Sequence, residues 1–389
     1  MQPVGGRSSE PATMAAAPKL SRHRRQYCAR PRPIGKLIHK PTVFPARISV
    51  TAAHFGIANP TWGITIDGHA HPNAGLRMKT IVIAIGGNSL IRDAQHMSVP
   101  DQYAAVVETA RHITDLLERR YRIVITHGNG PQVGFILLRS EHSRGILHQV
   151  PLDSIVADTQ GALGYQVQQA LENEFRRRGL KRSVATVVTQ TLVDRQDPAF
   201  AKPSKPIGQF YTRAEAEERM RVEKWLMVED AGRGWRRAVA SPRPVRIIES
   251  EVVKHLVKDG YVVIAAGGGG IPVVADEQGM LRGVAAVIDK DLASAVLAGA
   301  IGADLLVIST AVEKVCLDFG KPGERALDVM TAAEARQYMA DGHFPPGSML
   351  PKIQACLRFL EGGGREALIT CPGKLSAALA GQTGTRVIG

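Results

Sequence analysis

Three lysines in this chain stand where an ammonium group could neutralise a bound anion. Lys290 precedes Asp291 in "VIDKDLAS", directly ahead of a predicted helix, so the carboxylate lies near the positive end of that helix and can orient the lysine beside it. Lys352 falls in the first turn of another predicted helix, which is unfavourable for a cation unless an anion shares the site. Lys205, in "KPSKPIG", has prolines on both sides that stiffen its loop. Considered alone, the pair of Lys290 and Asp291 can equally be an ion pair on the surface. Lys205 alone can equally be an ordinary exposed lysine.

Glycine-rich turns could bring backbone N–H groups to the same anion. Each follows a predicted strand: "GGNS" at 86–89, "HGNGPQVG" at 127–134 and "GGGG" at 267–270. In an open parallel sheet such turns gather at the carboxyl ends of the strands, where ligands bind. Gly130 permits close approach of the backbone, and Pro131 suits the first position of a helix. The turns carry no lysine of their own, so the countercharge has to come from the three lysines elsewhere in the chain.

Short apolar runs alternate with longer helical patterns from residue 79 onward. This order predicts βαβ units, and uninterrupted apolar runs suit strands that helices cover on both faces. We therefore predict an α/β fold with an open, largely parallel sheet sandwiched by helices. The predicted strands are 80–85, 122–126, 184–189, 261–266, 305–309, 367–370 and 386–388. The predicted helices are 102–119, 159–178, 249–258, 292–300, 332–339 and 350–360. Asp101 is the expected N-cap of the first helix.

One segment, from Asp194 to about Val245, breaks this alternation. It is dense in proline, glycine, charged and aromatic residues, and it is too long for an ordinary connection. We predict an inserted subdomain or lid here, within a main domain that spans residues 78–389.

The net charge of +13 is unevenly distributed along the chain. Residues 1–77 hold eleven Lys or Arg against Glu10 and Asp67, a net of +9, which leaves +4 for residues 78–389. Such a mixed surface predicts no nucleic-acid partner for the main domain. Three interpretations of the basic N-terminal extension stay open: a stretch added by a misplaced start codon, a disordered tail, or an organelle transit peptide.

The composition excludes several other classes. No apolar run approaches the ~20 residues of a membrane-spanning helix, so no membrane partner is expected. The four cysteines show neither a CxxC spacing nor the density of a disulfide framework, which favours free thiols in a reducing cytosol. The twelve histidines form no HxxxH or HExxH pattern, so no protein-ligated transition metal is expected.

Ten motifs in order resemble those of the carbamate kinases, which have the amino-acid-kinase fold, across residues 79–389. They are "AIGGNSL", "HGNGPQVG", "PLD" with "QGALGY", "KPIG", "EDAGRGWRR", "SPRP", "AAGGGGIPVV", "AVIDKDLAS", "AVEKV" and "GSMLPKIQA". The resemblance implies reversible phosphoryl transfer, ATP + carbamate = ADP + carbamoyl phosphate, with Mg²⁺ bridging nucleotide oxygens. It further implies a cytoplasmic homodimer that makes ATP in the arginine deiminase pathway. Residues 1–77 have no counterpart in the family, which favours the misplaced start.

The resemblance also implies roles for individual residues. Carbamate and the transferring phosphoryl group would be bound by Gly86, Gly87, Asn88, Gly128, Asn129 and Gly130. The nucleotide would be bound by Gly267, Gly268, Gly269, Gly270, Val312, Val315 and Lys352. Lys205, Lys290 and Lys352 would neutralise the phosphoryl charge, and Asp291 would hold lysines in position. The inserted segment would close over the site.

Among the positions that depart from the family pattern, two bear on nucleotide binding. The family commonly has an aromatic residue where Cys316 stands and asparagine where Asp318 stands. Because this stretch is implied to line the adenine pocket, the departure bears on nucleotide affinity.

Three rival functions stay open to test. The spacing Gly128-x-Gly130-xxx-Gly134 could indicate an NAD-dependent dehydrogenase, but the stretch that follows, "RSEHSRGILHQVPLDS", is not the strand with an acidic end which that fold requires. Another enzyme of the same fold could act on an amino-acid carboxylate or a nucleoside monophosphate. A non-catalytic ligand-sensing protein of this fold would typically have lost one of the three lysines or Asp291, and all four are present.

Overall fold

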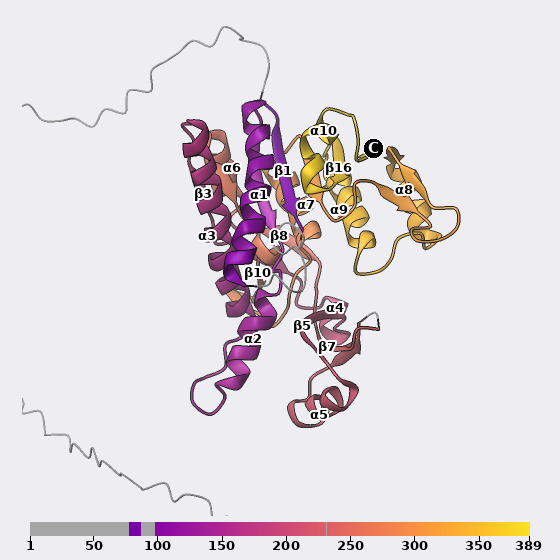
Figure 1. Ribbon diagram of the computed structural model, residues 1–389. Coiled ribbons are helices and arrows are strands. Elements are labelled where there is room, and N and C mark those ends of the chain that lie inside the picture. Colours follow the sequence, from indigo (N-terminus) through magenta and orange to yellow (C-terminus); the bar gives the residue numbers. More distant parts are fainter. Residues whose placement is uncertain (1–77, 87–97, 231) are drawn as a thin grey trace, which may run out of the picture. The chain divides into compact units, whose positions relative to one another are not determined.

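The computed structural model describes residues 78–86, 98–230 and 232–389 (Figure 1). The expectations for residues 1–77, Gly87 and Asn88 concern positions outside these ranges. Across the described ranges, no helix combines the length and the apolar character needed to cross a membrane.

An eight-stranded sheet forms the centre of the domain (Figure 1). Its order is β15 (Val329–Thr331), β17 (Thr385–Ile388), β16 (Glu366–Thr370), β12 (Leu305–Ser309), β1 (Thr80–Ile85), β2 (Arg122–His127), β9 (Val262–Ile264) and β3 (Val184–Thr186). From β16 to β3 all neighbouring strands run parallel, and β17 runs antiparallel to β16. The prediction of a largely parallel sheet is confirmed.

Helices cover both faces of this sheet, as predicted. One face packs against α1 (Val99–Glu118), α3 (Leu152–Arg178) and α10 (Leu375–Leu379), and the other against α6 (Ser250–Lys258), α7 (Lys290–Ile301), α8 (Ala332–Ala340) and α9 (Met349–Glu361). Because successive side chains of a strand point to opposite faces, Ile81 and Ile83 of β1 join the first layer, while Val82 and Ala84 join the second.

The start of α1 differs from the expectation. Ser98 is the N-cap, and Asp101 is the third residue of the helix rather than its cap. Asp101 N donates to Ser98 Oγ at 3.4 Å, and Ser98 N donates to the Asp101 carboxylate at 3.2 Å, which together form a capping box. Similarly, α3 begins at Leu152, seven residues before its predicted start, with Pro151 as its N-cap.

The predicted strand 184–189 is divided in the structure. β3 ends at Thr186, and the chain then enters β4 (Gln190–Val193), which belongs to a different sheet. Gln160 of α3 holds the bend, since its buried amide accepts from Thr189 N at 2.8 Å and donates to Thr189 O at 2.9 Å. Thr189 O also accepts from Ile271 N at 2.9 Å, so both backbone groups of Thr189 are paired.

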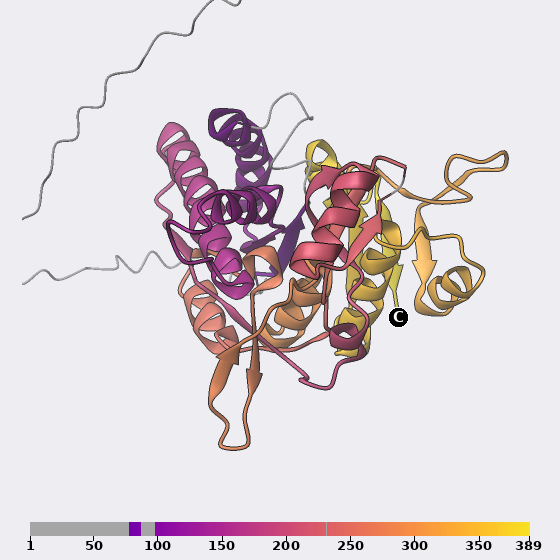
Figure 2. The same ribbon diagram turned by 90° about the horizontal axis from the view of Figure 1, so that it is seen from below.

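Two smaller sheets complete the main body. β4 pairs with β8 (Pro244–Ile247) and β10 (Ile271–Ala275), and β10 forms a hairpin with β11 (Leu281–Gly283) that projects from the domain (Figure 2). β13 (Val315–Leu317) and β14 (Arg325–Leu327) form a separate pair. Short 3-10 turns occur at Gly267–Gly269 and Pro372–Lys374.

A subdomain with its own small core lies within the segment 194–245, here called the lid subdomain. It consists of α4 (Pro198–Ala201), β5 (Lys205–Tyr211), α5 (Arg213–Glu223), β6 (Met227–Glu229) and β7 (Trp235–Val239). The strands form an antiparallel sheet in the order β5-β7-β6, over a cluster of Tyr211, Ala216 and Met227.

The lid subdomain rests on α2 (Gln132–His142), whose start was expected at Pro131 but whose length was not predicted. Pro131 is the N-cap of this helix rather than its first residue. Two glycines make the approach of the lid subdomain to α2 possible, because a Cβ atom on Gly134 of α2 would lie 2.7 Å from Gly208 Cα of β5. A side chain at Gly134 would push the strand away from the helix.

Candidate active site

The first turn of α7 brings two of the predicted residues together. Asp289 is the N-cap of this helix, and its Oδ1 accepts from Asp291 N at 3.0 Å and from Leu292 N at 3.2 Å. The helix therefore begins at Lys290, two residues before the predicted start, and Asp291 lies inside the first turn rather than ahead of it. Its carboxylate is in the favourable position for a helix N-terminus.

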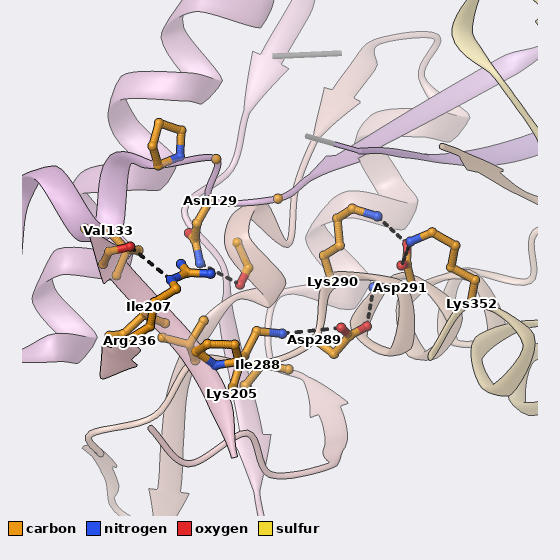
Figure 3. Close-up of a pocket in the computed structure, with 18 residues that line it drawn as sticks. Asn129, Val133, Lys205, Ile207, Arg236, Ile288, Asp289, Lys290, Asp291 and Lys352 are labelled. Atoms are coloured by element: carbon orange, nitrogen blue, oxygen red, sulfur yellow. Dashed lines mark hydrogen bonds and ion pairs between the residues drawn. The ribbon is translucent and has the colours of Figure 1, made fainter. Parts of the chain in front are cut away.

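Asp291 holds two of the three lysines. It is almost fully buried, and it accepts from Lys290 Nζ through Oδ1 and from Lys352 Nζ, 2.9 Å away, through Oδ2 (Figure 3). The carboxylate thus explains how Lys352 is tolerated in the first turn of α9, where the helix dipole disfavours a cation. The arrangement agrees with the predicted role of Asp291 as the residue that positions lysines.

Burial and charge act in opposite directions on these groups. Burial opposes ionisation of Asp291, but the charges of Lys290 and Lys352 outweigh it and hold the pKa of Asp291 at about 2. For Lys290 burial dominates, and together with the charge of Lys352 it lowers the pKa of Lys290 below that of an ordinary lysine, although Asp291 counteracts part of the effect. The site therefore holds a firmly ionised carboxylate beside a lysine that gives up its proton more easily than usual.

The third lysine comes from the lid subdomain. Lys205, the first residue of β5, has its Nζ 3.3 Å from Asp289 Oδ2 (Figure 3). Asp289 thus uses one carboxylate oxygen to begin α7 and the other to hold the lid. Sequence analysis passed over Asp289, although an aspartate ahead of an apolar helical run is a recognisable N-cap signal.

The glycine turn after β2 forms the opposite wall. Lys290 lies against Gly128, since a Cβ atom there would be 3.4 Å from Lys290 Cδ. Asn129 Nδ2 lies 3.4 Å from Gly268 O, and a side chain on Gly268 would collide with the Asn129 amide. Gly130 has a positive φ of 52°, which a glycine adopts without strain. Two glycine turns that are far apart in sequence are therefore in direct contact.

One pocket of about 260 Å³ joins these elements. The predicted residues that line it are Gly128, Asn129, Gly130, Lys205, Gly268, Lys290, Asp291 and Lys352. Arg236 of β7 also lines it and was not predicted; its Nε donates to Gly208 O at 3.1 Å, and Asp230 accepts from its Nη1 at 2.9 Å. The alternation of side chains along a strand is the signal that could have placed Arg236 toward the pocket.

Other predicted residues lie outside the pocket lining. Gly86 follows β1 and lies against Ser309 O, and Gly267 packs on buried His127. Gly269 lies against Ile288 O, and Gly270 lies against Thr191. Val312 is half-buried, and Val315 is buried in β13. Gly87 and Asn88 fall outside the described residues. The implied roles of these residues stay predictions.

The pocket has the properties of an anion site. Four cationic side chains, those of Lys205, Arg236, Lys290 and Lys352, converge on it, and its two carboxylates are each engaged by lysine. Over the described residues, no group of three or more His, Cys, Asp or Glu side chains is placed to hold a metal ion.

Comparisons with known proteins cover nearly all of the described chain. The model of the Amino acid kinase family matches residues 79–371. A carbamate kinase-like protein from Escherichia coli, YahI, is 54% identical over 311 residues, which are 79% of this chain and 98% of that protein. The carbamate kinase of Thermococcus kodakarensis is 46% identical over 314 residues, 80% of this chain and 99% of its own length. Among solved structures, carbamate kinase from Giardia lamblia bound to AMP-PNP is 41% identical with a TM-score of 0.75, and the match covers 80% of this chain and 98% of that one.

Proposed function

Because the chain belongs to the amino acid kinase family, and within it to the carbamate kinases, we propose that the pocket between α7, α9 and the lid subdomain is its phosphotransfer site. The reaction is ATP + carbamate = ADP + carbamoyl phosphate. One observation supports this assignment above all: Asp291 binds both Lys290 and Lys352. The glycine turn 128–130 and Lys205 line the same pocket.

Phosphoryl transfer suits a site of this composition. Its transition state spreads negative charge over the equatorial oxygens, so catalysis depends mainly on positioning and charge stabilisation. Lys290 and Lys352 are held on one side by Asp291, and Lys205 enters from the lid, so three ammonium groups can surround the transferring group. Carbamate is itself a nucleophilic anion, which removes the need for a strong general base.

The glycine turn supplies the second part of the proposed mechanism. In this proposal, the N–H groups of Gly128, Asn129 and Gly130, at the start of α2, donate hydrogen bonds to carbamate and to phosphoryl oxygens. Gly86, Gly87 and Asn88 are assigned to the same ligands by the family resemblance alone. Gly267, Gly268, Gly269, Gly270, Val312 and Val315 are assigned to the nucleotide side by the family resemblance alone.

Magnesium enters the proposal through the nucleotide. The carboxylates that line the described pocket are Asp289 and Asp291, and both are already engaged by lysines and by the N-terminus of α7. These residues do not fit a dedicated metal site. Mg²⁺ is therefore assigned to the phosphate oxygens of ATP or ADP, where it offsets their charge.

The biological setting is proposed on the family resemblance. We infer a cytoplasmic homodimer that makes ATP at the end of the arginine deiminase pathway. An edge strand supports the dimer: β3 ends the eight-stranded sheet, and Val188 and Tyr165 beside it are more than half exposed. Pairing along such an edge would cover these side chains.

The reaction itself provides the test. The purified chain with ADP, Mg²⁺ and carbamoyl phosphate should make ATP, and Lys352→Ala should nearly abolish this without unfolding the protein. Lys258→Ala, which removes an exposed lysine from the last turn of α6, is the matched control and should keep full activity.

Two outcomes would point to the rival functions. Turnover with an amino-acid acyl phosphate or a nucleoside diphosphate, and none with carbamoyl phosphate, would indicate a different acceptor. A folded protein that binds ADP and turns over none of these compounds would indicate a ligand-sensing protein.

A further inference from the structure

A second cavity, of about 320 Å³, lies where α2 meets the lid subdomain. It shares no lining residue with the phosphotransfer pocket. Its size is at the low end of small-molecule sites, which hold about 300–1,000 Å³. The wall consists of Leu137, Ser140, Glu141, Arg144, Gln149, Val150, Pro151, Leu152, Ile155, Trp225, Arg237 and Ala285.

Glu141 is an unsatisfied buried carboxylate in this wall. Its side chain is 7% exposed, and neither carboxylate oxygen has a hydrogen-bond partner within the described chain. The nearest cation, Arg219 Nη1, is 3.8 Å away and donates instead to Glu223. Burial accordingly raises the pKa of Glu141. A buried carboxylate without donors is costly, and an incoming N–H group would relieve that cost.

Arg237 is the complementary group, on β7 of the lid subdomain. Its guanidinium stacks 4.5 Å above the Trp225 ring, and within the described residues it has no hydrogen-bond or ion-pair partner. Burial lowers the pKa of Arg237, whereas the charge of Glu141 opposes this. The two opposite charges thus attract each other across the cavity and form no ion pair.

The wall also contains three further polar side chains, those of Ser140, Arg144 and Gln149. Ser140 Oγ accepts from Val150 N at 2.9 Å, and Arg144 donates to Glu223 at 3.0 Å. Leu137, Leu152 and Ile155 form an apolar surface beside these groups. Within the described residues, the cavity therefore combines a carboxylate that accepts no hydrogen bond, a guanidinium that donates none, and an apolar surface beside them.

We propose that this cavity binds a zwitterionic α-amino acid with a compact apolar side chain. The ammonium group donates to Glu141, the carboxylate accepts from Arg237, and the side chain lies against the wall of α2 and α3. Both interactions are charge-assisted hydrogen bonds, which are the strong kind. A ligand with only one of the two charges leaves the other buried group unsatisfied.

The position of Arg237 connects this cavity to the phosphotransfer pocket. Successive residues of a strand point to opposite sides, and on β7 Arg236 lines the phosphotransfer pocket while Arg237 lines the second cavity. A ligand between Glu141 and Arg237 would fix β7 against α2, and with it Arg236. This coupling rests on the proposed function, whereas binding at the cavity does not.

Calorimetry on the full chain tests the binding directly, with L-valine and L-leucine as the probes. Isobutylamine and isovalerate each keep one charge of valine, and L-aspartate adds a third charge. We expect both apolar amino acids to bind at least about tenfold more tightly than these three compounds, because each charged hydrogen bond contributes about that factor. Equal affinity for L-valine and isovalerate would overturn the proposal, as would the absence of binding at millimolar concentrations.

Two variants localise the binding. Glu141→Gln keeps the shape of the side chain, and Arg237→Met keeps its contact with Trp225; each should weaken L-valine binding at least about tenfold. Glu217→Gln removes an exposed carboxylate from α5 of the lid subdomain and should leave binding unchanged. Binding that survives both cavity variants would place the ligand elsewhere and contradict the proposal. Because heat is measured without turnover, a failed kinase assay does not affect this result.

Discussion

Lys352 Nζ donates to Asp291 Oδ2 at 2.9 Å, although 61 positions separate the two residues in the chain. Asp291 also accepts from its neighbour Lys290, so a single buried carboxylate holds two ammonium groups on α7 and α9. Replacing Asp291 by asparagine therefore leaves two buried cations without their counterion. We expect Asp291→Asn to lower the free energy of unfolding by about 3 kcal/mol and to reduce kcat strongly. Urea unfolding and the ATP-forming assay measure the two effects.

The control for this substitution is Asp328→Asn, which removes an exposed carboxylate paired with Lys314. Surface pairs contribute at most about 1 kcal/mol, so both readouts should change little. Equal effects of the two substitutions would refute the role of Asp291.

The pKa of Lys290 predicts an alkaline limit on activity. Because its folded-state pKa is lowered by burial, Lys290 loses its proton at a lower pH than an ordinary lysine. The charge that we propose for neutralising the phosphoryl group is lost with that proton. The plot of kcat/KM against pH should fall on the alkaline side below the ordinary lysine value of 10.5. At pH values between the lowered pKa and 10.5, Lys290 is more protonated in the unfolded chain than in the folded one. The contribution of Lys290 to the free energy of unfolding therefore rises with pH in this range.

Lys290→Arg separates this effect from general alkaline inactivation. Guanidinium stays protonated above pH 12, so any residual activity of this variant should lack the alkaline decrease. A decrease at the same pH in both proteins would assign it to another group.

The two functions of Asp289 can be separated by substitution. Asparagine is a good N-cap but carries no charge, so Asp289→Asn should keep α7 stable while it weakens the hold on Lys205 and raises the KM for carbamoyl phosphate. Asp289→Ala also loses the cap, and we expect a further loss of about 1 kcal/mol in unfolding free energy. For both variants, thermal unfolding measures the effect of the N-cap, and steady-state kinetics measure the effect of the ion pair with Lys205. If the two variants had the same stability and the same KM, Asp289 would have only one of these two functions.

The contact between Gly134 and Gly208 predicts a steric effect on the lid subdomain. Gly134→Ala places a methyl group 2.7 Å from Gly208 Cα, so β5 or α2 must shift, at a cost of about 1–3 kcal/mol. Because Lys205 lies on the displaced strand, the KM for carbamoyl phosphate should rise as well. Urea unfolding and kinetics test both effects.

Gly161→Ala in α3 provides the matched control. No heavy atom lies within 4 Å of the added methyl group, so this change should stabilise the helix by about 0.5–1 kcal/mol and leave KM unchanged. Destabilisation of equal size in both variants would argue against a specific contact at Gly134.

The eight-stranded sheet could be predicted from the sequence because its strands are buried on both faces. Apolar runs such as 80–85 and 305–309 leave little ambiguity, and β1 and β12 have the predicted bounds. The lid strands β5 and β6 could not be predicted in the same way. β6 is only three residues long, and proline, glycine and polar residues interrupt the apolar residues of β5. Both strands pack on a local cluster around Tyr211 and Met227 rather than on the central core.

The sequence predicted which charged residues belong to the site more fully than it predicted how those residues are arranged. Lys205, Lys290, Asp291 and Lys352 all line one pocket, as a shared anion site requires. Asp289 and Arg236 were missed. Asp289 could have been recognised, because an aspartate ahead of an apolar helical run is an N-cap signal. Alternation along β7 separates Arg236 from Arg237, but which of the two faces the pocket depends on how β7 pairs with β5.

The bridge from Asp291 to Lys352 also orders the assembly of the site during synthesis. A growing chain that has produced α7 but not α9 has Asp291 paired with Lys290 alone. The phosphotransfer pocket thus gains its full charge only after the last of its segments has left the ribosome. A fragment that ends before α9 lacks Lys352, and with it one of the four cationic side chains that line the pocket.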